Sequence, residues 1–431
     1  MEVKNMASSE QRMRVHPYYG ILALLALVGL VAIGVCLTEG MRVTALSSPV
    51  AWGMWVAFYI YFAGLSTGSF LLSTLIYVFG MHQYEKVGRM ALLSALFALV
   101  AAMILVWIDL GHPWRFWKVF TRWNYTSVLA WEMLVYLLYT VILVIGLWAL
   151  MRCDLAHLAL TVSGWRGKLY RFLTFGFRCP ESEAAYRRCH AQSMRVVRIL
   201  GIIGIPILIM GGTGSIFAVV AAKPYWYTGL LPIIFLVSGL ASSAALMTFL
   251  YAFFGRKDED HLAITRGMAN LMVLFLCIEV VLLASEYLVG LYGRIPEHIR
   301  VYHAILFGPF PYVFWVGQLL MGTLIPIALA TLSRTRNNIF WLGLGGLSAM
   351  IGIVAVRLNL VVPAYVVPAL EGLEHAINQP RWAYAYFPSF WEWASSLGTI
   401  ALVVLLFSLA FQFLPMFHEF PQRFQAASES R

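Results

Sequence analysis

The sequence predicts an all-α, polytopic membrane protein with about ten transmembrane helices. Of its 431 residues, 61% are hydrophobic and only 12% are charged, a balance far from that of a soluble globular domain. Apolar segments of about twenty residues, the length that crosses a bilayer as a helix, recur along the whole chain. The expected spans are residues 17–37, 50–80, 88–110, 125–151, 194–221, 227–254, 264–292, 309–332, 338–363 and 389–415.

The first span resembles a secretory signal only in the cations that precede it, Lys4, Arg12 and Arg14. No small-x-small cleavage pattern follows it. The "IGVC" that ends at Cys36 also lacks the small residue that a lipoprotein site places before cysteine. We therefore expect a retained helix.

The cations are divided unevenly between the two sides of the membrane. With the amino terminus inside, the alternate loops and tails hold 21 of the 30 Lys and Arg, the opposite side holds 8, and Arg357 lies within a span. The positive-inside rule then places both termini in the cytoplasm. The expected location is a bacterial or archaeal inner membrane. The net charge of +10 follows from this topology, so no nucleic-acid partner is expected, only membrane lipids and protein subunits.

The cysteines and histidines argue against a resident metal centre. Five cysteines show neither a CxxC nor a CxxCH pattern, so covalent haem and an iron–sulfur cluster are not expected in this chain. Cys179 and Cys189, in a basic loop, are expected to be reduced, inert thiols. All ten histidines fall in loops or at span ends, so no facing pair is available for haem b. No metal site is expected, and a redox role requires a partner that holds the metal centres.

An internal repeat organises the chain. The segment "GLSTGSFLLSTLIYVFG" (64–80) matches "GLASSAALMTFLYAFFG" (239–255) at 6 of 17 positions. In the next span of each half an arginine precedes an acid by twenty residues: Arg89 and Asp109, then Arg266 and Glu286. Duplication predicts two four-helix bundles in parallel repeat, with the first and last spans flanking them. The alternative is chance similarity between glycine- and leucine-rich helices.

The expected domain boundaries follow from this repeat. They give a cytoplasmic amino terminus with the first span at 1–49 and a first bundle at 50–221 that includes a basic cytoplasmic loop at 152–193. A second bundle follows at 222–363. An extracytoplasmic loop, the last span and a cytoplasmic tail occupy 364–431.

Ionisable residues within spans are costly and therefore mark candidate sites. Asp109, His112 and Glu132 collect toward the extracytoplasmic side and are the candidate catalytic residues. His112 either satisfies a backbone carbonyl beside Pro113 or, with its near-neutral pKa, bonds a quinone carbonyl and transfers a proton. Trp114 is expected to border the bound ring, together with Tyr125.

Two further sets of candidate residues lie deeper in the membrane or in the second half of the chain. Ser66 and Thr67 are candidate cofactor contacts, although small residues of this kind also serve close helix packing. Glu279, Glu286, Arg357 and Asn359 are candidates for a proton relay. The alternative is a structural ion pair inherited from duplication.

Five segments, in order, resemble one family: "GLSTGSFLLS", "IDLGHPWRFW", "SVLAWEM", "RLNL" and "YAYFPSFWEWASSLGTIAL". The sequence is similar to the polysulfide reductase membrane-subunit family (NrfD/PsrC-like), in particular the ten-span branch that includes HybB and DsrP. The resemblance implies a haem-free, quinone-reactive subunit with two four-helix bundles. It also implies that an iron–sulfur subunit docks near the quinone pocket. The loop at 152–193 matches no family motif.

The expected function is therefore that of one subunit in a respiratory redox complex, not catalytic alone. Menaquinone or ubiquinone is expected near the extracytoplasmic face of the first bundle, exchanging electrons with a ferredoxin-like iron–sulfur subunit. Further catalytic or cytochrome subunits complete the complex, and proton translocation is left open. The alternatives are a secondary transporter, since parallel repeats also build carriers, and a purely structural membrane anchor.

Overall fold

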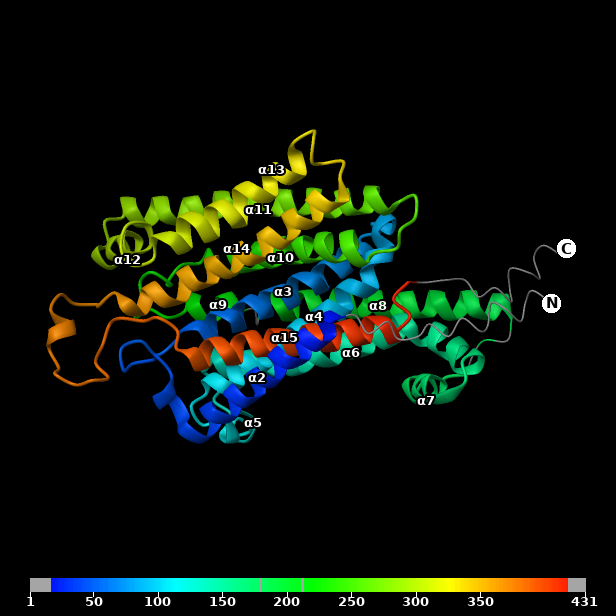
Figure 1. The fold of residues 1–431 in the computed structure, drawn as a ribbon, viewed down its shortest axis with the longest axis horizontal. Coiled ribbons are helices and arrows are strands. Elements are labelled where there is room, and N and C mark those ends of the chain that lie inside the picture. The colour runs from blue at the N-terminus through cyan, green and yellow to red at the C-terminus, as the bar shows by residue number, and fades with distance from the viewer. Residues whose placement is uncertain (1–16, 179, 181, 211–212, 418–431) are drawn as a thin grey trace.

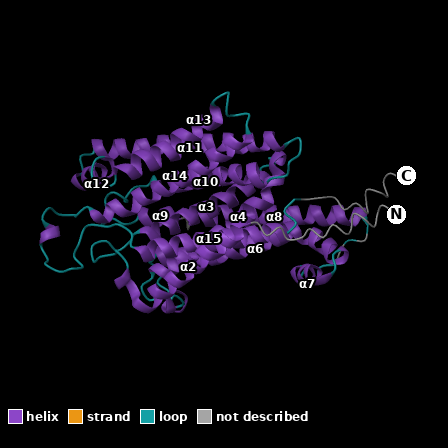
Figure 2. Cartoon of the chain, in the orientation of Figure 1, coloured by secondary structure: helices purple, strands orange, loops and turns teal. Residues whose placement is uncertain are grey.

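The computed structural model describes residues 17–178, 180, 182–210 and 213–417. Across these residues the chain forms helices joined by loops, with no strand, as Figure 2 shows. Ten helices are long and apolar enough to cross a membrane, which confirms the predicted fold class. They are α2 (Pro17–Glu39), α3 (Met54–Tyr77), α4 (Glu85–Asp109), α6 (Val128–Thr161), α8 (Glu183–Met210), α10 (Leu231–Phe254), α11 (His261–Tyr292), η4 with α13 (Val313–Leu324 and Ile325–Thr331), α14 (Ile339–Val366) and α15 (Phe390–Phe413).

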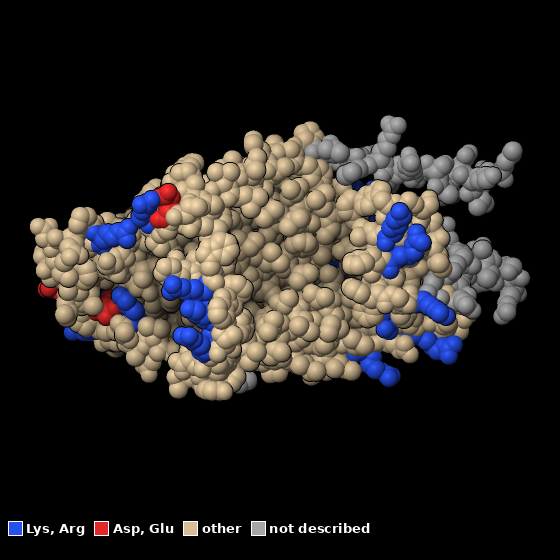
Figure 3. All heavy atoms as spheres, turned by 90° about the horizontal axis from the view of Figure 1, so that it is seen from below, with Lys and Arg blue, Asp and Glu red and all other residues tan. Residues whose placement is uncertain are grey.

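The spans lie side by side along the long axis of the molecule (Figure 1). We call the end at which α4 finishes the Asp109 end, on the left of Figure 1, and the opposite end, toward which α2 has its first residue, the Pro17 end. The short helices α5 (Lys118–Thr121) and α12 (Pro296–Leu306) lie toward the Asp109 end, whereas α7 (Gly164–Leu173) lies at the Pro17 end. Lys, Arg, Asp and Glu gather toward the two ends of the face in Figure 3 and leave its broad middle almost free of charge, as an apolar membrane belt requires.

The centre of the fold is the crossing of α3 and α10, which carry the two copies of the sequence repeat. Almost every residue of α3 is buried. Both helices run from the Asp109 end to the Pro17 end, and their backbones touch where Gly68 meets Gly239. Without a Cβ at either position, the two helices approach more closely than larger residues allow.

The remaining spans pack around this centre. Helix α4 packs on α3, and α11 packs on α10, so the two repeats are built alike. The flanking helices α2 and α15 pack together at Gly29 and Gly398, and α15 also contacts α4. The domain boundaries at residues 50, 222 and 364 stay predictions.

The expected basic loop at 152–193 is largely helical. It contains the end of α6, the whole of α7 and the first turns of α8. The mean hydropathy of these first turns is too low to predict a membrane span, because several arginines lie among the apolar residues. The fifth span therefore begins at Glu183, earlier than expected, and α9 (Thr213–Ala218) forms the end of the predicted segment.

The prediction of reduced thiols is wrong for Cys189, which forms a disulfide with Cys153. The early start of α8 is the reason: it places Cys189 on a helix that packs against α6, with the two Cα atoms 6.7 Å apart. Cys36 and Cys277 are free thiols, the first buried and the second exposed. Cys179 lies outside the described residues.

Candidate functional site

Asp109 is the last residue of α4, where the chain leaves the apolar span. Gly111 has a φ of +68°, a conformation that glycine adopts readily and that turns the chain away from the helix. The indole of Trp107 then donates to the carbonyl of Pro113 at 3.1 Å and fixes the turn. Within this turn the Oδ1 atom of Asp109 is buried and has no hydrogen-bond partner among the described residues.

Glu392, in the first turn of α15, is a fully buried carboxylate held by three donors. Its Oε2 accepts the backbone N–H groups of Ala45 at 2.8 Å and Ser389 at 2.9 Å. Its Oε1 accepts the hydroxyl of Tyr386 at 2.7 Å. The Tyr386 oxygen in turn accepts the backbone N–H of Met54 at 2.7 Å. These bonds tie the loop after α2, the start of α3 and the start of α15 together.

Asp109 lies close enough to this arrangement to interact electrostatically with Glu392 and Tyr386. We call Asp109, Tyr386 and Glu392 the acid cluster. Burial raises the pKa of Tyr386 well above its usual value, and the neighbouring carboxylates raise it further. The phenol therefore keeps its proton and serves as a hydrogen-bond donor.

Glu392 and Tyr386 were not among the predicted site residues. A signal for Glu392 was present, because Ser389 and Glu392 form the S-x-x-E pattern of a capping box ahead of an apolar run. Its contact with Ala45 spans 347 residues of sequence. No local pattern indicates a contact of that kind.

The structure does not gather the other predicted residues around Asp109. His112 is exposed, and no hydrogen bond joins it to Asp109 in the described part of the chain. The side chains of Trp114 and Tyr125 are 69% and 77% exposed. Trp114 packs edge-on against Trp107, whereas Tyr125 packs edge-on against Trp123.

Glu132 lies in a separate buried network. Its Oε1 accepts the hydroxyl of Tyr136 at 3.0 Å, and that hydroxyl lies 3.0 Å from the hydroxyl of Tyr59. Ser66 donates to the carbonyl of Ala95 at 2.7 Å, so it serves helix packing. Thr67 is half-buried and forms no side-chain hydrogen bond with a described residue.

The predicted relay residues form two groups. Arg357 is buried with its guanidinium 4.1 Å from the ring centre of Phe235. It interacts electrostatically with Glu279, without an ion pair of 4.0 Å or less in the described residues. Glu286 lies apart and accepts the hydroxyl of Thr228 at 3.2 Å.

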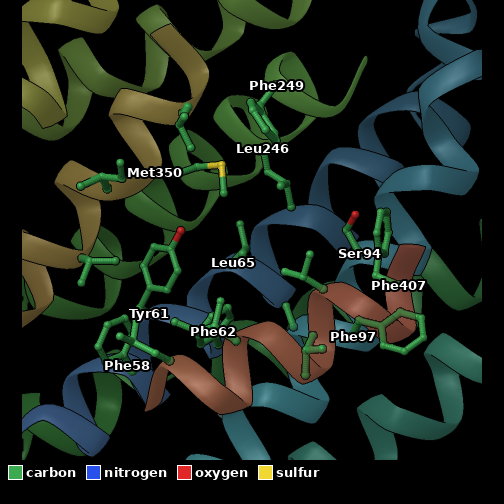
Figure 4. A pocket seen from close by; sticks show the side chains of 18 of the residues that line it. Phe58, Tyr61, Phe62, Leu65, Ser94, Phe97, Leu246, Phe249, Met350 and Phe407 are labelled. Atoms are coloured by element: carbon green, nitrogen blue, oxygen red, sulfur yellow. The ribbon is translucent and has the colours of Figure 1, made fainter. Parts of the chain in front are cut away.

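A cavity of about 980 Å³ runs along α3, between α2 and α15 on one side and α10 and α14 on the other. Figure 4 shows its aromatic and aliphatic lining. It extends from Gln412, near the Pro17 end, to Tyr386 of the acid cluster. Ile351 and Val404 line it and are exposed, so it opens on the apolar flank of the bundle. We call it the α3 groove.

Within the described residues, no group of three or more His, Cys, Asp and Glu side chains is placed to hold a metal ion. Ten apolar spans, buried acids at one end and a groove that opens toward the bilayer define a multi-pass integral membrane protein with titratable groups at the membrane boundary. The chain belongs to the family described as polysulphide reductase, NrfD, whose model matches residues 42–369. The flanking helices α2 and α15 lie outside that match.

Three relatives illustrate the family. The chain is 45% identical to a subunit of selenate reductase from Mesobacillus selenatarsenatis, over 93% of this chain and 94% of that one. It is 27% identical to the Hdr-like menaquinol oxidoreductase integral membrane subunit of Archaeoglobus fulgidus, over 90% and 91%. It is 25% identical to one of the polypeptides of polysulfide reductase from Wolinella succinogenes, over 72% and 93%. These relatives are subunits of oxidoreductases.

Proposed function

We propose that this chain is the quinone-reactive membrane subunit of an oxidoreductase complex. The observation that carries the proposal is the α3 groove, which opens on the apolar flank of the bundle and reaches Tyr386 of the acid cluster. An isoprenoid quinone has a long apolar chain and a ring with two polar oxygens. A groove with a long apolar wall and a few polar side chains matches that chemistry.

The groove also fits a quinone by size and lining. Its volume of about 980 Å³ lies at the upper end of the range of about 300–1,000 Å³ that small-molecule sites occupy. Tyr61, Ser94 and Asn359 are among the few polar groups on its otherwise apolar wall. Bilayer access matters because a quinone reaches and leaves its site through the membrane.

A bound quinol supplies two electrons and two protons on oxidation to the quinone, and reduction is the reverse. Asp109 carries a carboxyl oxygen without a hydrogen-bond donor but does not line the groove, so it is the proposed acceptor for a quinol proton that has left the groove. His112, exposed three residues further on, passes the proton to water. Glu132, in its network with Tyr136, is a second proposed acceptor.

The electrons pass to a partner. We propose a ferredoxin-like iron–sulfur subunit that docks at the Asp109 end and takes one electron at a time. The 45% identity to a selenate reductase subunit supports a complex whose catalytic subunit reduces an oxyanion of that type, with electrons flowing from quinol to oxyanion.

We propose that the Asp109 end is extracytoplasmic. The support is the distribution of cations: Arg166, Lys168 and Arg171 lie on α7 at the opposite end, and cytoplasmic loops are richer in Lys and Arg. Figure 3 shows basic side chains and no acidic side chain at the end of this face where Figure 1 places α7. A proton relay through Glu279 and Arg357 toward that end stays a prediction.

The test uses the full chain with its partner subunits in lipid nanodiscs. The preparation is expected to contain extractable quinone and an iron–sulfur protein. Asp109→Asn is expected to lower quinol-dependent turnover at least about tenfold without loss of assembly. Glu371→Gln, an exposed acid at the same end, is the matched control. A preparation without quinone whose turnover is unaffected by Asp109→Asn would contradict the proposal.

A further inference from the structure

The hydroxyl of Tyr61 projects into the α3 groove, as Figure 4 shows. Tyr61 is only 5% exposed, yet its hydroxyl forms no hydrogen bond with any described residue. Buried hydroxyls in proteins are nearly always paired. What distinguishes Tyr61 is that its unpaired hydroxyl opens into a cavity, where it is available to a ligand.

Asn359 presents a complementary group to the same groove. Its Nδ2 donates to the Oε1 of Gln318 at 2.9 Å, and this bond orients the amide. Gln318 lies in η4, whose hydrogen bonds follow the π-helical pattern, with the N–H of Ile325 bonded to the carbonyl of Leu320. π-Helical turns are often associated with functional sites. The side-chain oxygen of Asn359 receives no donor from the described residues.

The two groups lie at a similar depth in the membrane. Tyr61 is seven residues after Met54, the first residue of α3, and Asn359 is seven residues before Val366, the last residue of α14. At about 1.5 Å per residue, each lies roughly 10 Å from the Asp109 end. Arg357 lies nearby, with its Nη2 atom 3.5 Å from where a Cβ on Gly64 would stand. The Asp109 end is also where the electron-accepting partner is proposed to dock.

We infer that Tyr61 and Asn359 hold the ring of a quinone in the α3 groove. The hydroxyl of Tyr61 donates to a carbonyl oxygen of the quinone, and the amide oxygen of Asn359 accepts from a hydroxyl of the quinol. The isoprenoid chain runs along Leu65, Leu246, Met350 and Phe407, which line the groove. This inference rests on the proposed function and adds the place where the ring binds.

The experiment measures binding rather than turnover. The full chain in lipid nanodiscs is titrated with a menaquinone that carries one isoprenoid unit, and bound quinone is quantified after filtration. Tyr61→Phe keeps the ring but loses the hydroxyl, and the loss of one hydrogen bond predicts a dissociation constant about five- to tenfold higher. Because that hydroxyl has no protein partner, the variant is expected to unfold at the wild-type temperature.

Tyr77→Phe is the matched control. Tyr77 is on the same helix, is buried, and has a hydroxyl without a hydrogen bond to any described residue, but it does not line the groove. Its substitution is expected to leave the dissociation constant unchanged. A second variant, Val354→Phe, adds bulk to the groove wall and is expected to lower the amount of bound quinone.

The outcomes separate this inference from the proposed function. If Tyr61→Phe and Val354→Phe bind the probe as tightly as the wild type while Asp109→Asn loses turnover, the ring binds elsewhere and only the inference fails. If the wild type binds no quinone, both fail. A groove that retains phospholipid and does not exchange it for the probe also overturns the inference.

Discussion

The backbone of Gly68 in α3 lies directly against the backbone of Gly239 in α10, so that a methyl group on Gly68 would overlap the carbonyl oxygen of Gly239. Gly239 also lies close to Gly64, the residue to which it corresponds in the repeat: a Cβ on Gly239 would be 2.8 Å from the carbonyl oxygen of Gly64. Contact between corresponding positions is expected when two copies of a structure meet across a two-fold axis. The two similar segments of the sequence thus contact each other directly in the fold.

Gly68→Ala is expected to destabilise the protein. The added methyl group meets main-chain atoms of Gly239 that have no flexible end to move aside. Overpacking of this kind costs about 1–3 kcal/mol. The measurement is thermal unfolding of the purified chain in detergent.

The control for this prediction is Gly34→Ala in α2. A Cβ at Gly34 meets no atom within 4 Å. In an exposed helical position, alanine is favoured over glycine by about 0.5–1 kcal/mol. If both variants unfold at the same temperature, the close contact between α3 and α10 is absent.

Tyr386→Phe is expected to loosen the acid cluster. It removes the donor to Glu392 and the acceptor for the N–H of Met54, both of them buried. A buried polar group left unpaired costs roughly 1–3 kcal/mol. Tyr384→Phe is the comparison, because no hydrogen bond of its hydroxyl is found among the described residues. Equal unfolding temperatures for the two variants would exclude the bridging role of Tyr386.

Neutralising the acid of a buried ion pair is expected to destabilise the protein more than neutralising the acid of an exposed ion pair. Arg89 and Asp154 pair at 2.6 Å with side chains only 5% and 10% exposed, so Asp154→Asn leaves a buried cation and costs about 3–5 kcal/mol. Glu183 pairs with Arg187 on the surface of α8. Glu183→Gln is expected to cost less than about 1 kcal/mol. Urea or heat unfolding of the two variants measures the difference, and similar losses would contradict it.

The helices of this fold were predictable because their apolar lengths are set by the membrane. The spans around α3, α10 and α14 each coincide with a largely apolar segment of the sequence. The first turns of α8 were not predicted, since their arginines lower the mean hydropathy although the segment is helical. The thickness of the membrane thus sets the length of the apolar segments that cross it. It does not constrain the polar helical turns that extend into water.

The site was predictable only in part. Asp109 was identified because an acid at the end of a span is costly and therefore informative. The burial of Glu392 was not predicted, because two of its three donors depend on how α15 packs beside the loop after α2 and the start of α3. Tyr61, which we propose to bind the quinone ring, was not predicted for a similar reason: one tyrosine among many apolar residues gives no signal until the cavity beside it is known.

Low pH is expected to weaken the contact between Lys86 and Asp258 at the Pro17 end. Lys86 donates to Asp258 at 2.7 Å, and this hydrogen bond holds the pKa of Asp258 below its usual value. A carboxyl whose pKa is lower in the folded state adds stability above its unfolded pKa of about 3.9, and the gain disappears as the pH falls through the folded value.

The measurement is thermal unfolding of the wild type and Asp258→Asn between neutral pH and about pH 3. At neutral pH the variant is expected to be less stable by up to about 1 kcal/mol, as for a partly exposed pair. The two curves are expected to converge in acid. A difference that persists unchanged at the lowest pH would show that the contact does not depend on the charge of Asp258.

The disulfide between Cys153 and Cys189 gives a direct chemical test of how α6 and α8 pack. Trypsin cuts beside both residues and releases the peptides 153–166 and 189–195. A digest made without reductant, after free thiols have been blocked with an alkylating reagent, is expected to contain these two peptides joined. Under the proposed topology the bond lies at the cytoplasmic end, where disulfides are rare. Two separately alkylated peptides would therefore contradict the bond itself, whereas the joined pair would confirm that α8 begins beside α6 within the basic segment.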